Sequence, residues 1–171
     1  MAVSRFRTVF LLHGKGGWPG GSVLQLQELL QASFPEPRYV RPSLPHGREQ
    51  EQQRAEASVD FLRQLQIDPG ALVVGISLGG LVAAKLQETG RDDLHVICIS
   101  SPTRADGVEL QRKMPHRLAF YSSQDDVIAG RTSQWPDLAE ACNITWLSHD
   151  TDSHKEELAQ LIVPYMELSI E

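Results

Sequence analysis

The sequence has few of the features that mark a secreted, membrane-spanning or metal-binding chain. Its only cysteines, Cys98 and Cys142, lack the close spacing of metal ligands, so we expect reduced thiols and no bound metal. The apolar run behind the basic N-terminal residues, 9–12, is far too short for a signal peptide or a membrane span. We therefore expect a cytoplasmic protein with no membrane span.

Positive charge is also scarce. The chain carries 16 Lys and Arg residues against 22 Asp and Glu residues, a formal net charge of −6. This balance argues against a nucleic acid or an anionic membrane as partner. No repeat, linker or low-complexity segment interrupts the 171 residues, which indicates one domain over 1–171.

The chain is organised around the stretch 71–84, which combines an apolar run with a glycine-flanked serine. Residues 71–74 follow the breaker 68–70 and indicate a strand buried on both faces. Gly75, Ser77 and Gly79 come next, and an apolar, Ala-rich helix follows them. A serine with glycines two residues before and after it, between a strand and a helix, is the pattern of a nucleophile elbow. A side chain on either glycine would crowd so sharp a turn.

Strands alternate with helices along the rest of the sequence. Such alternation predicts a parallel sheet covered on both faces, an α/β/α sandwich of about six strands. Two predicted helix starts carry the capping-box pattern, Ser22 with Gln25 and Ser153 with Glu156. We expect strands at 8–12, 38–41, 71–74, 94–99, 117–121 and 143–147, helices at about 22–33, 48–66, 78–89, 136–141 and 153–165, and a polar excursion with a helical turn or two at 104–116.

The elbow resembles that of the α/β-hydrolase family, and the resemblance extends to the loop after the first strand. His13-Gly14-Lys15-Gly16-Gly17 is similar to the family's H-G-x-x-G loop. The resemblance implies that the backbone N–H groups of Lys15 and Leu78 form an oxyanion hole. Phosphate binding is the rival interpretation of a glycine-rich loop, but neither a P-loop nor a dinucleotide motif is present. We therefore expect no cofactor.

A serine nucleophile needs a histidine as base and an acid that orients the histidine. The family supplies them in the chain order Ser, Asp, His. Here Asp125 and Asp126 follow the fifth predicted strand, at the sheet edge where such folds place their sites. Adjacent side chains point in different directions, so only one of the two can face the histidine. The stretch 123–129 resembles the family's acid loop in a way that favours Asp126.

Two histidines compete for the role of base. His154 lies within the second capping box, which would place it in the first turn of the last helix. The positive end of that helix would disfavour the imidazolium that catalysis forms. His149 lies two residues past the sixth predicted strand, on the loop where the family delivers its base. His149 is therefore the preferred candidate, with His154 as the alternative.

The chain is short for the family, which implies a lidless enzyme similar to the small serine hydrolases typified by retinoblastoma-binding protein 9. The predicted function is hydrolysis of a small carboxylic ester or thioester through an acyl-enzyme on Ser77, with an amide left open. The alternatives are an acyltransferase and a non-catalytic binding protein that retains the fold. The expected substrate-binding residues lie on loops that should face the same end of the sheet: Trp18, His46, Pro102, Ile128 and Trp135.

Overall fold

The computed structural model describes residues 2–48 and 54–169, and six parallel strands form its central sheet. The strand order is β2-β1-β3-β4-β7-β8. This confirms the predicted α/β sandwich, and five of the six strands lie within about two residues of their predicted positions. The strands are β1 (Thr8–Leu12), β2 (Arg38–Val40), β3 (Leu72–Ile76), β4 (His95–Ile99), β7 (Arg117–Tyr121) and β8 (Glu140–Asn143).

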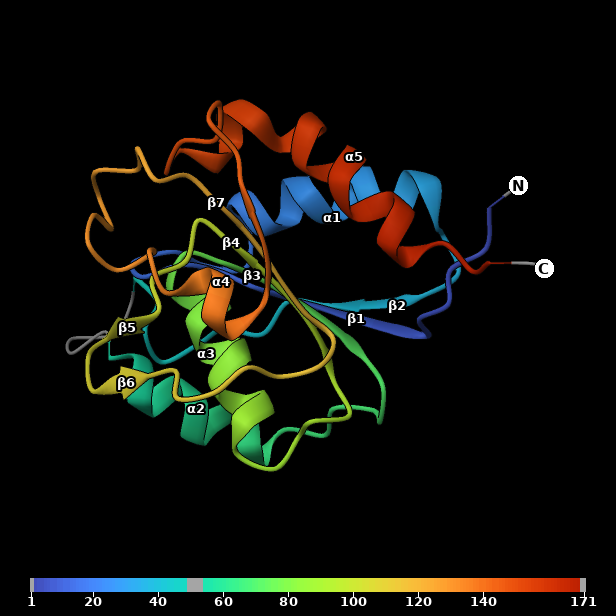
Figure 1. The fold of residues 1–171 in the computed structure, drawn as a ribbon. Coiled ribbons are helices and arrows are strands. Elements are labelled where there is room, and N and C mark those ends of the chain that lie inside the picture. Colours follow the sequence, from blue (N-terminus) through green and yellow to red (C-terminus); the bar gives the residue numbers. More distant parts are fainter. Residues whose placement is uncertain (1, 49–53, 170–171) are drawn as a thin grey trace.

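Helices cover both faces of the sheet (Figure 1). On one face lie α1 (Ser22–Ser33) and α5 (Lys155–Met166), and on the other lie α2 (Ala55–Gln64), α3 (Leu78–Glu88) and the short α4 (Trp135–Leu138). Successive residues of β1 alternate between two apolar cores: Val9 packs toward α1 and α5, and Phe10 toward α2 and α3. All five residues of β3 are buried, as its apolar run predicted.

The structure corrects several predicted elements. The sixth strand ends at Asn143 instead of starting there, so β8 precedes the predicted position. Residues 104–109 form a hairpin of β5 (Arg104–Ala105) and β6 (Val108–Glu109) instead of a helical turn. Neither capping box forms: the N-caps are Gly21 for α1 and His154 for α5. The helix predicted from 48 begins at Ala55, and residues 49–53 of that prediction lie outside the described residues.

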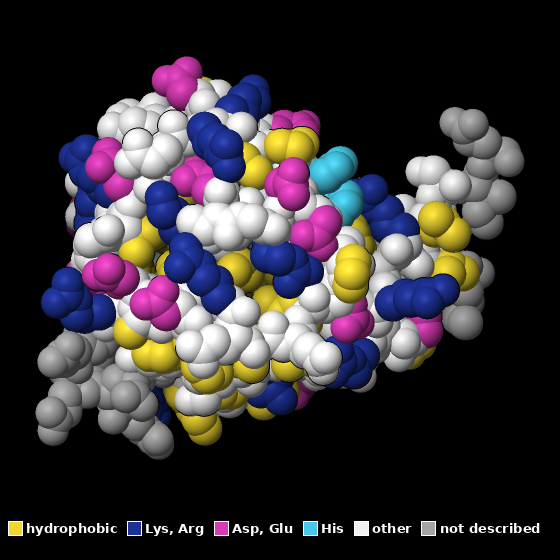
Figure 2. Space-filling model, turned by 90° about the horizontal axis from the view of Figure 1, so that it is seen from below, with side chains coloured by type: hydrophobic (Ala, Val, Ile, Leu, Met, Phe, Trp, Pro, Cys, Tyr) yellow, Lys and Arg dark blue, Asp and Glu magenta, His cyan; other side chains and the backbone are white. Residues whose placement is uncertain are grey.

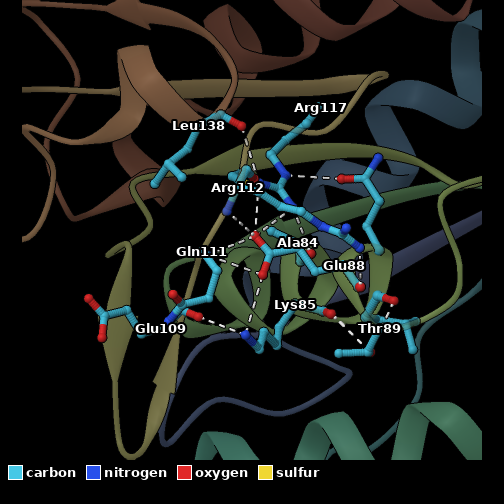
Figure 3. A network of polar contacts seen from close by, with 12 residues as sticks. Ala84, Lys85, Glu88, Thr89, Glu109, Gln111, Arg112, Arg117 and Leu138 are labelled. Carbon is cyan, nitrogen blue, oxygen red and sulfur yellow. Dashed lines mark hydrogen bonds and ion pairs between the residues drawn. The ribbon is translucent and has the colours of Figure 1, made fainter.

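A buried polar network joins the last turn of α3 to the start of β7 (Figure 3). The guanidinium of Arg117 is fully buried and forms an ion pair with Glu88 at 3.4 Å. It also donates to the carbonyl oxygens of Ala84 (2.9 Å), Arg112 (2.9 Å) and Leu138 (3.1 Å). A buried cation requires such complete pairing. The network fixes α3, whose first turn follows Ser77, against the strand that leads to Asp125.

The surface on the α2 and α3 side carries both signs of charge. Figure 2 shows Lys and Arg side chains interspersed with Asp and Glu side chains on this face. Local ion pairs contribute to the mixing, such as Arg63 with Asp60 on α2 at 3.4 Å. Within residues 2–48 and 54–169, every helix is too short or too polar to span a lipid bilayer.

Candidate active site

Ser77 occupies a strained turn between β3 and α3. Its backbone has φ 53° and ψ −122°, values that residues with a side chain rarely adopt. The flanking glycines allow the turn. A Cβ on Gly75 would lie 2.3 Å from the carbonyl carbon of Gly79, and a Cβ on Gly79 would lie 2.4 Å from the carbonyl oxygen of Leu12. The steric reason predicted for the two glycines is therefore confirmed.

A chain of two hydrogen bonds starts at the Ser77 hydroxyl. Its Oγ lies 3.0 Å from Nε2 of His149, and Nδ1 of the same ring lies 2.9 Å from Oδ2 of Asp125. A carboxylate only accepts hydrogen bonds, so Nδ1 carries the proton and the lone pair of Nε2 faces the hydroxyl. This is the tautomer that can take a proton from the serine.

The acid that contacts the histidine is Asp125, so the prediction of Asp126 for this position is wrong. The Asp125 side chain is 1% exposed, whereas Asp126 is exposed. The turn sets this choice: the N–H of Asp125 donates to the carbonyl oxygen of Ser122 at 3.1 Å, and its Oδ1 accepts from the N–H of Val127 at 3.1 Å. Asp125 therefore points inward, and its neighbour points to solvent.

His149 lies on the loop between β8 and a 3₁₀ turn, η1 (Thr151–His154). The hydroxyl of Ser100 donates to the carbonyl oxygen of Ser148 at 3.3 Å and so holds this loop near the end of β4. His154, the alternative base, ends η1 and packs its ring 5.3 Å from that of Trp146. Of the two histidines, the structure brings His149 to Ser77.

The 13–17 loop lies directly against Ser77. A Cβ on Gly14 would lie 3.2 Å from Cβ of Ser77, so glycine permits this approach. The N–H of Gly17 donates to the carbonyl oxygen of Gly14 at 2.9 Å and closes a tight turn around Lys15. Within the described residues, the backbone N–H groups of Lys15 and Leu78 have no hydrogen-bond acceptor. Both can therefore receive an acceptor from a ligand.

A cleft of about 370 Å³ opens beside Ser77 and His149. Of the predicted substrate-binding residues, Trp18 lines it and is 46% exposed. Its indole ring lies under the guanidinium of Arg48 at 5.0 Å. The other residues that line the cleft are His13, Gly14, Lys15, Gly17, Gly21, Ser22, Val23, Gln25, Ile76, Asp150, Thr151 and Asp152.

Four of the five predicted substrate-binding residues are instead buried away from the cleft. Pro102 and Ile128 are buried and do not line the cleft. Trp135 is fully buried, and its indole N–H donates to the carbonyl oxygen of Ser101 at 2.8 Å. His46 is fully buried and hydrogen-bonded on both ring nitrogens. Each is accounted for by packing, so the predictions for His46, Pro102, Ile128 and Trp135 are wrong.

Charged and polar side chains that sequence reasoning missed dominate the cleft. Lys15 and Arg48 bring positive charge, and Asp150 and Asp152 bring negative charge. The hydroxyl of Ser153 donates to the Asp150 carboxylate at 2.7 Å and lowers the pKa of that group. Gln25, on the first turn of α1, accepts from Nζ of Lys155 at 2.7 Å. These residues come from separate segments, and no local motif marks them.

A parallel sheet with a strained serine after its third strand in sequence, and with an aspartate and a histidine delivered from later loops, defines the class of α/β hydrolases. The chain belongs to this class: the model of the family described as "Alpha/beta hydrolase family" matches residues 9–167. No curated protein matches the chain in sequence.

Solved structures share the fold at low sequence identity. Alpha/beta hydrolase domain-containing protein 10 from mouse has a TM-score of 0.73 and 10% identity, with 95% of this chain and 90% of that chain covered. A monoacylglycerol lipase from Paleococcus ferrophilus has a TM-score of 0.71 and 15% identity, with 97% of this chain and 96% of that chain covered. An alpha-beta serine hydrolase homologue from Coxiella burnetii has a TM-score of 0.68 and 20% identity, covering 96% and 86%. At these identities the likeness establishes the fold.

Proposed function

We propose that the protein is a serine hydrolase that cleaves a small carboxylic ester or thioester through an acyl-enzyme on Ser77. The observation that carries the proposal is the pair of hydrogen bonds from Ser77 Oγ to His149 Nε2 (3.0 Å) and from His149 Nδ1 to Asp125 Oδ2 (2.9 Å). Ser77 and His149 line a cleft, and the chain belongs to the α/β-hydrolase family. The roles of nucleophile, base and orienting acid follow from this arrangement.

In the first half of the reaction, Ser77 Oγ attacks the acyl carbonyl carbon while His149 Nε2 takes its proton. The carbonyl π electrons move to oxygen, and the N–H groups of Lys15 and Leu78 stabilise this oxyanion. The intermediate collapses as the bond to the alcohol or thiol breaks, and the imidazolium returns the proton to the leaving group. Asp125 holds the ring in position and stabilises its charge throughout.

In the second half, water replaces the departed alcohol or thiol. His149 Nε2 takes a proton from the water, whose oxygen attacks the acyl carbon. The second tetrahedral intermediate collapses with cleavage of the bond to Ser77 Oγ, which regains a proton from the imidazolium. The carboxylic acid leaves, and the enzyme returns to its starting state.

A small substrate is supported by the segment between β4 and β7, where larger family members often insert a cap. Here the fully described residues 100–116 form the β5–β6 hairpin and no cap domain. The mixed charges of the cleft also suit a polar or short acyl group better than a long hydrocarbon chain. The likeness to the small hydrolases typified by retinoblastoma-binding protein 9 and a cytoplasmic location stay predictions.

Labelling with a fluorophosphonate, followed by peptide mapping, tests the proposal. We expect covalent modification of wild-type protein at Ser77 and none of the Ser77→Ala variant. The same substitution should lower kcat toward p-nitrophenyl acetate by a factor on the order of a million. A folded wild-type protein that neither reacts with the probe nor hydrolyses any ester would instead indicate a binding protein.

A further inference from the structure

His46 is a fully buried histidine whose ring joins the 13–17 loop to α2. Its Nε2 lies 2.7 Å from the carbonyl oxygen of His13, and its Nδ1 lies 2.8 Å from Oγ of Ser58 on α2. A carbonyl oxygen only accepts, so Nε2 carries the ring proton and donates it. Nδ1 then accepts from the Ser58 hydroxyl. The Oγ of Ser58 also accepts the backbone N–H of His46 at 3.1 Å, so both residues are fixed.

The backbone of residues 46–48 binds the end of the 13–17 loop that follows Lys15. The carbonyl oxygen of His46 accepts the N–H of Gly16 at 3.0 Å, and the N–H of Arg48 donates to the carbonyl oxygen of Gly17 at 2.9 Å. His46 therefore contacts the 13–17 loop on both sides of Lys15, through the His13 carbonyl before it and the Gly16 N–H after it. The peptide that presents the Lys15 N–H is held between these two contacts.

We propose that His46 is a positioning residue that holds the Lys15 N–H in place as an oxyanion donor. This inference rests on the proposed function. A donor is effective only within about 2.7–3.1 Å of the developing oxyanion, so a small displacement of the loop weakens it. Buried away from the cleft, His46 does not itself touch the substrate. It acts through the backbone of the 13–17 loop.

The chemical state of the two neighbouring histidines fits this role. His13 accepts the N–H of Leu44 at Nε2 (3.0 Å), and its Nδ1 lies 3.0 Å from the carbonyl oxygen of Gly14, to which it donates. Burial lowers the pKa of His13, and it lowers the pKa of His46 to about 4. Asp106 raises the pKa of His46 and Lys15 lowers it, so the two charges act in opposite directions. Both rings are therefore neutral at pH 7, and the hydrogen bonds that hold the loop are intact.

Two substitutions at His46 separate hydrogen bonding from packing. His46→Leu fills a similar volume but leaves the His13 carbonyl oxygen without its donor. His46→Gln places a side-chain amide N–H close to the position of Nε2 and can keep that hydrogen bond. His95→Leu is the matched control, because His95 begins β4 at the opposite end of the sheet and loses a hydrogen bond to Tyr165 Oη (2.8 Å).

The first readout is steady-state hydrolysis of p-nitrophenyl acetate. We expect His46→Leu to lower kcat about tenfold to a hundredfold, with KM changed less than about threefold, because the lost contact acts on the transition state. His46→Gln should recover most of this loss, and His95→Leu should match wild type. Wild-type kcat in a folded His46→Leu variant would overturn the proposal.

The second readout is amide hydrogen exchange of the peptides that contain residues 13–17, which does not depend on activity. Exchange should be faster than wild type in His46→Leu and close to wild type in His46→Gln and His95→Leu. Unchanged exchange in His46→Leu would also overturn the proposal. An inactive wild-type protein that still shows this exchange pattern would refute the proposed function, and with it the catalytic role of His46, while the contact to the loop would stand.

Discussion

The carboxylate of Asp125 lies 2.9 Å from Nδ1 of His149, while the adjacent Asp126 points to solvent. The two residues share a loop, a charge and almost the same distance in sequence from Ser77. What separates them is the turn in which the Asp125 side chain accepts the N–H of Val127 at 3.1 Å. One pair of neighbouring aspartates therefore provides both a test of the site and its control.

Asp125→Asn should lower kcat toward p-nitrophenyl acetate by a factor on the order of ten thousand, because an amide at this position favours the wrong histidine tautomer. Asp126→Asn removes the same charge one residue away and should leave kcat within about threefold of wild type. Rates of the two purified variants, compared at equal folded fraction by circular dichroism, check the expectation. The reverse ranking would assign the acid to Asp126.

The two histidines near the C-terminus offer a similar comparison. His149→Gln removes the proposed base and should lower kcat about as far as Ser77→Ala, since members of a triad act as a unit. His154→Gln loses a ring contact with Trp146 but no contact to Ser77, and should retain most activity. Fluorophosphonate labelling rates give a second measure, because the probe also needs an activated hydroxyl. A His154→Gln variant as inactive as His149→Gln would contradict the assignment.

The sequence predicts those parts of the fold in which burial fixes the residue types. β1 and β3 are covered on both faces, so their continuous apolar runs mark them. β8 lies at the sheet edge with mostly exposed side chains, and the apolar residues Ile144 and Leu147 belong to the turn after it. The apolar pattern therefore predicts this strand too late in the sequence. The hairpin of β5 and β6 could have been predicted from Asp106-Gly107, a pair typical of hairpin turns, and both residues have positive φ.

The candidate site likewise has one part that the sequence predicts and another part that it does not. The nucleophile elbow requires glycines at fixed positions, so a local motif identifies Ser77. The walls of the cleft depend on which loop residues the tertiary structure buries. His46 lies on a loop and Trp135 begins the short α4, and both have polar ring atoms, yet hydrogen bonds to Ser58 and to the Ser101 carbonyl oxygen satisfy them inside the core. Such pairing is visible only once the loops are folded.

The shape and charge of the cleft predict the acyl-chain preference of the proposed hydrolase. With about 370 Å³ available and charged groups around it, the site can bury a short acyl chain, but its described residues form no apolar channel for a long one. We expect kcat/KM to be highest for p-nitrophenyl acetate or butyrate and to decline through octanoate to palmitate. The Ser77→Ala variant corrects each rate for background hydrolysis. A steady rise toward palmitate would require an apolar surface that the described residues do not form.

Acid should destabilise the protein through its buried histidines. Burial lowers the pKa of His46 from 6.5 to about 4, and the charged or titratable groups around it are His13, Lys15 and Asp106. Burial also lowers the pKa of His95 to about 4, and the corresponding groups there are His116, Arg5 and Asp93. Between the unfolded pKa of 6.5 and the folded pKa of about 4, these histidines bind protons in the unfolded chain but not in the folded chain. Stability is therefore complete above pH 6.5 and is lost as the pH falls toward 4.

His46, the more deeply buried of the two, should alone remove on the order of 2 kcal/mol from the free energy of unfolding between pH 6.5 and pH 5. Urea unfolding at pH 7, 6 and 5 measures the loss. His46→Gln lacks the titrating ring, so its stability should fall less over the same range, and the gap between variant and wild type should narrow with acid. If both proteins lost stability in parallel, the ring of His46 would have to stay accessible to protons in the folded state, contrary to its complete burial.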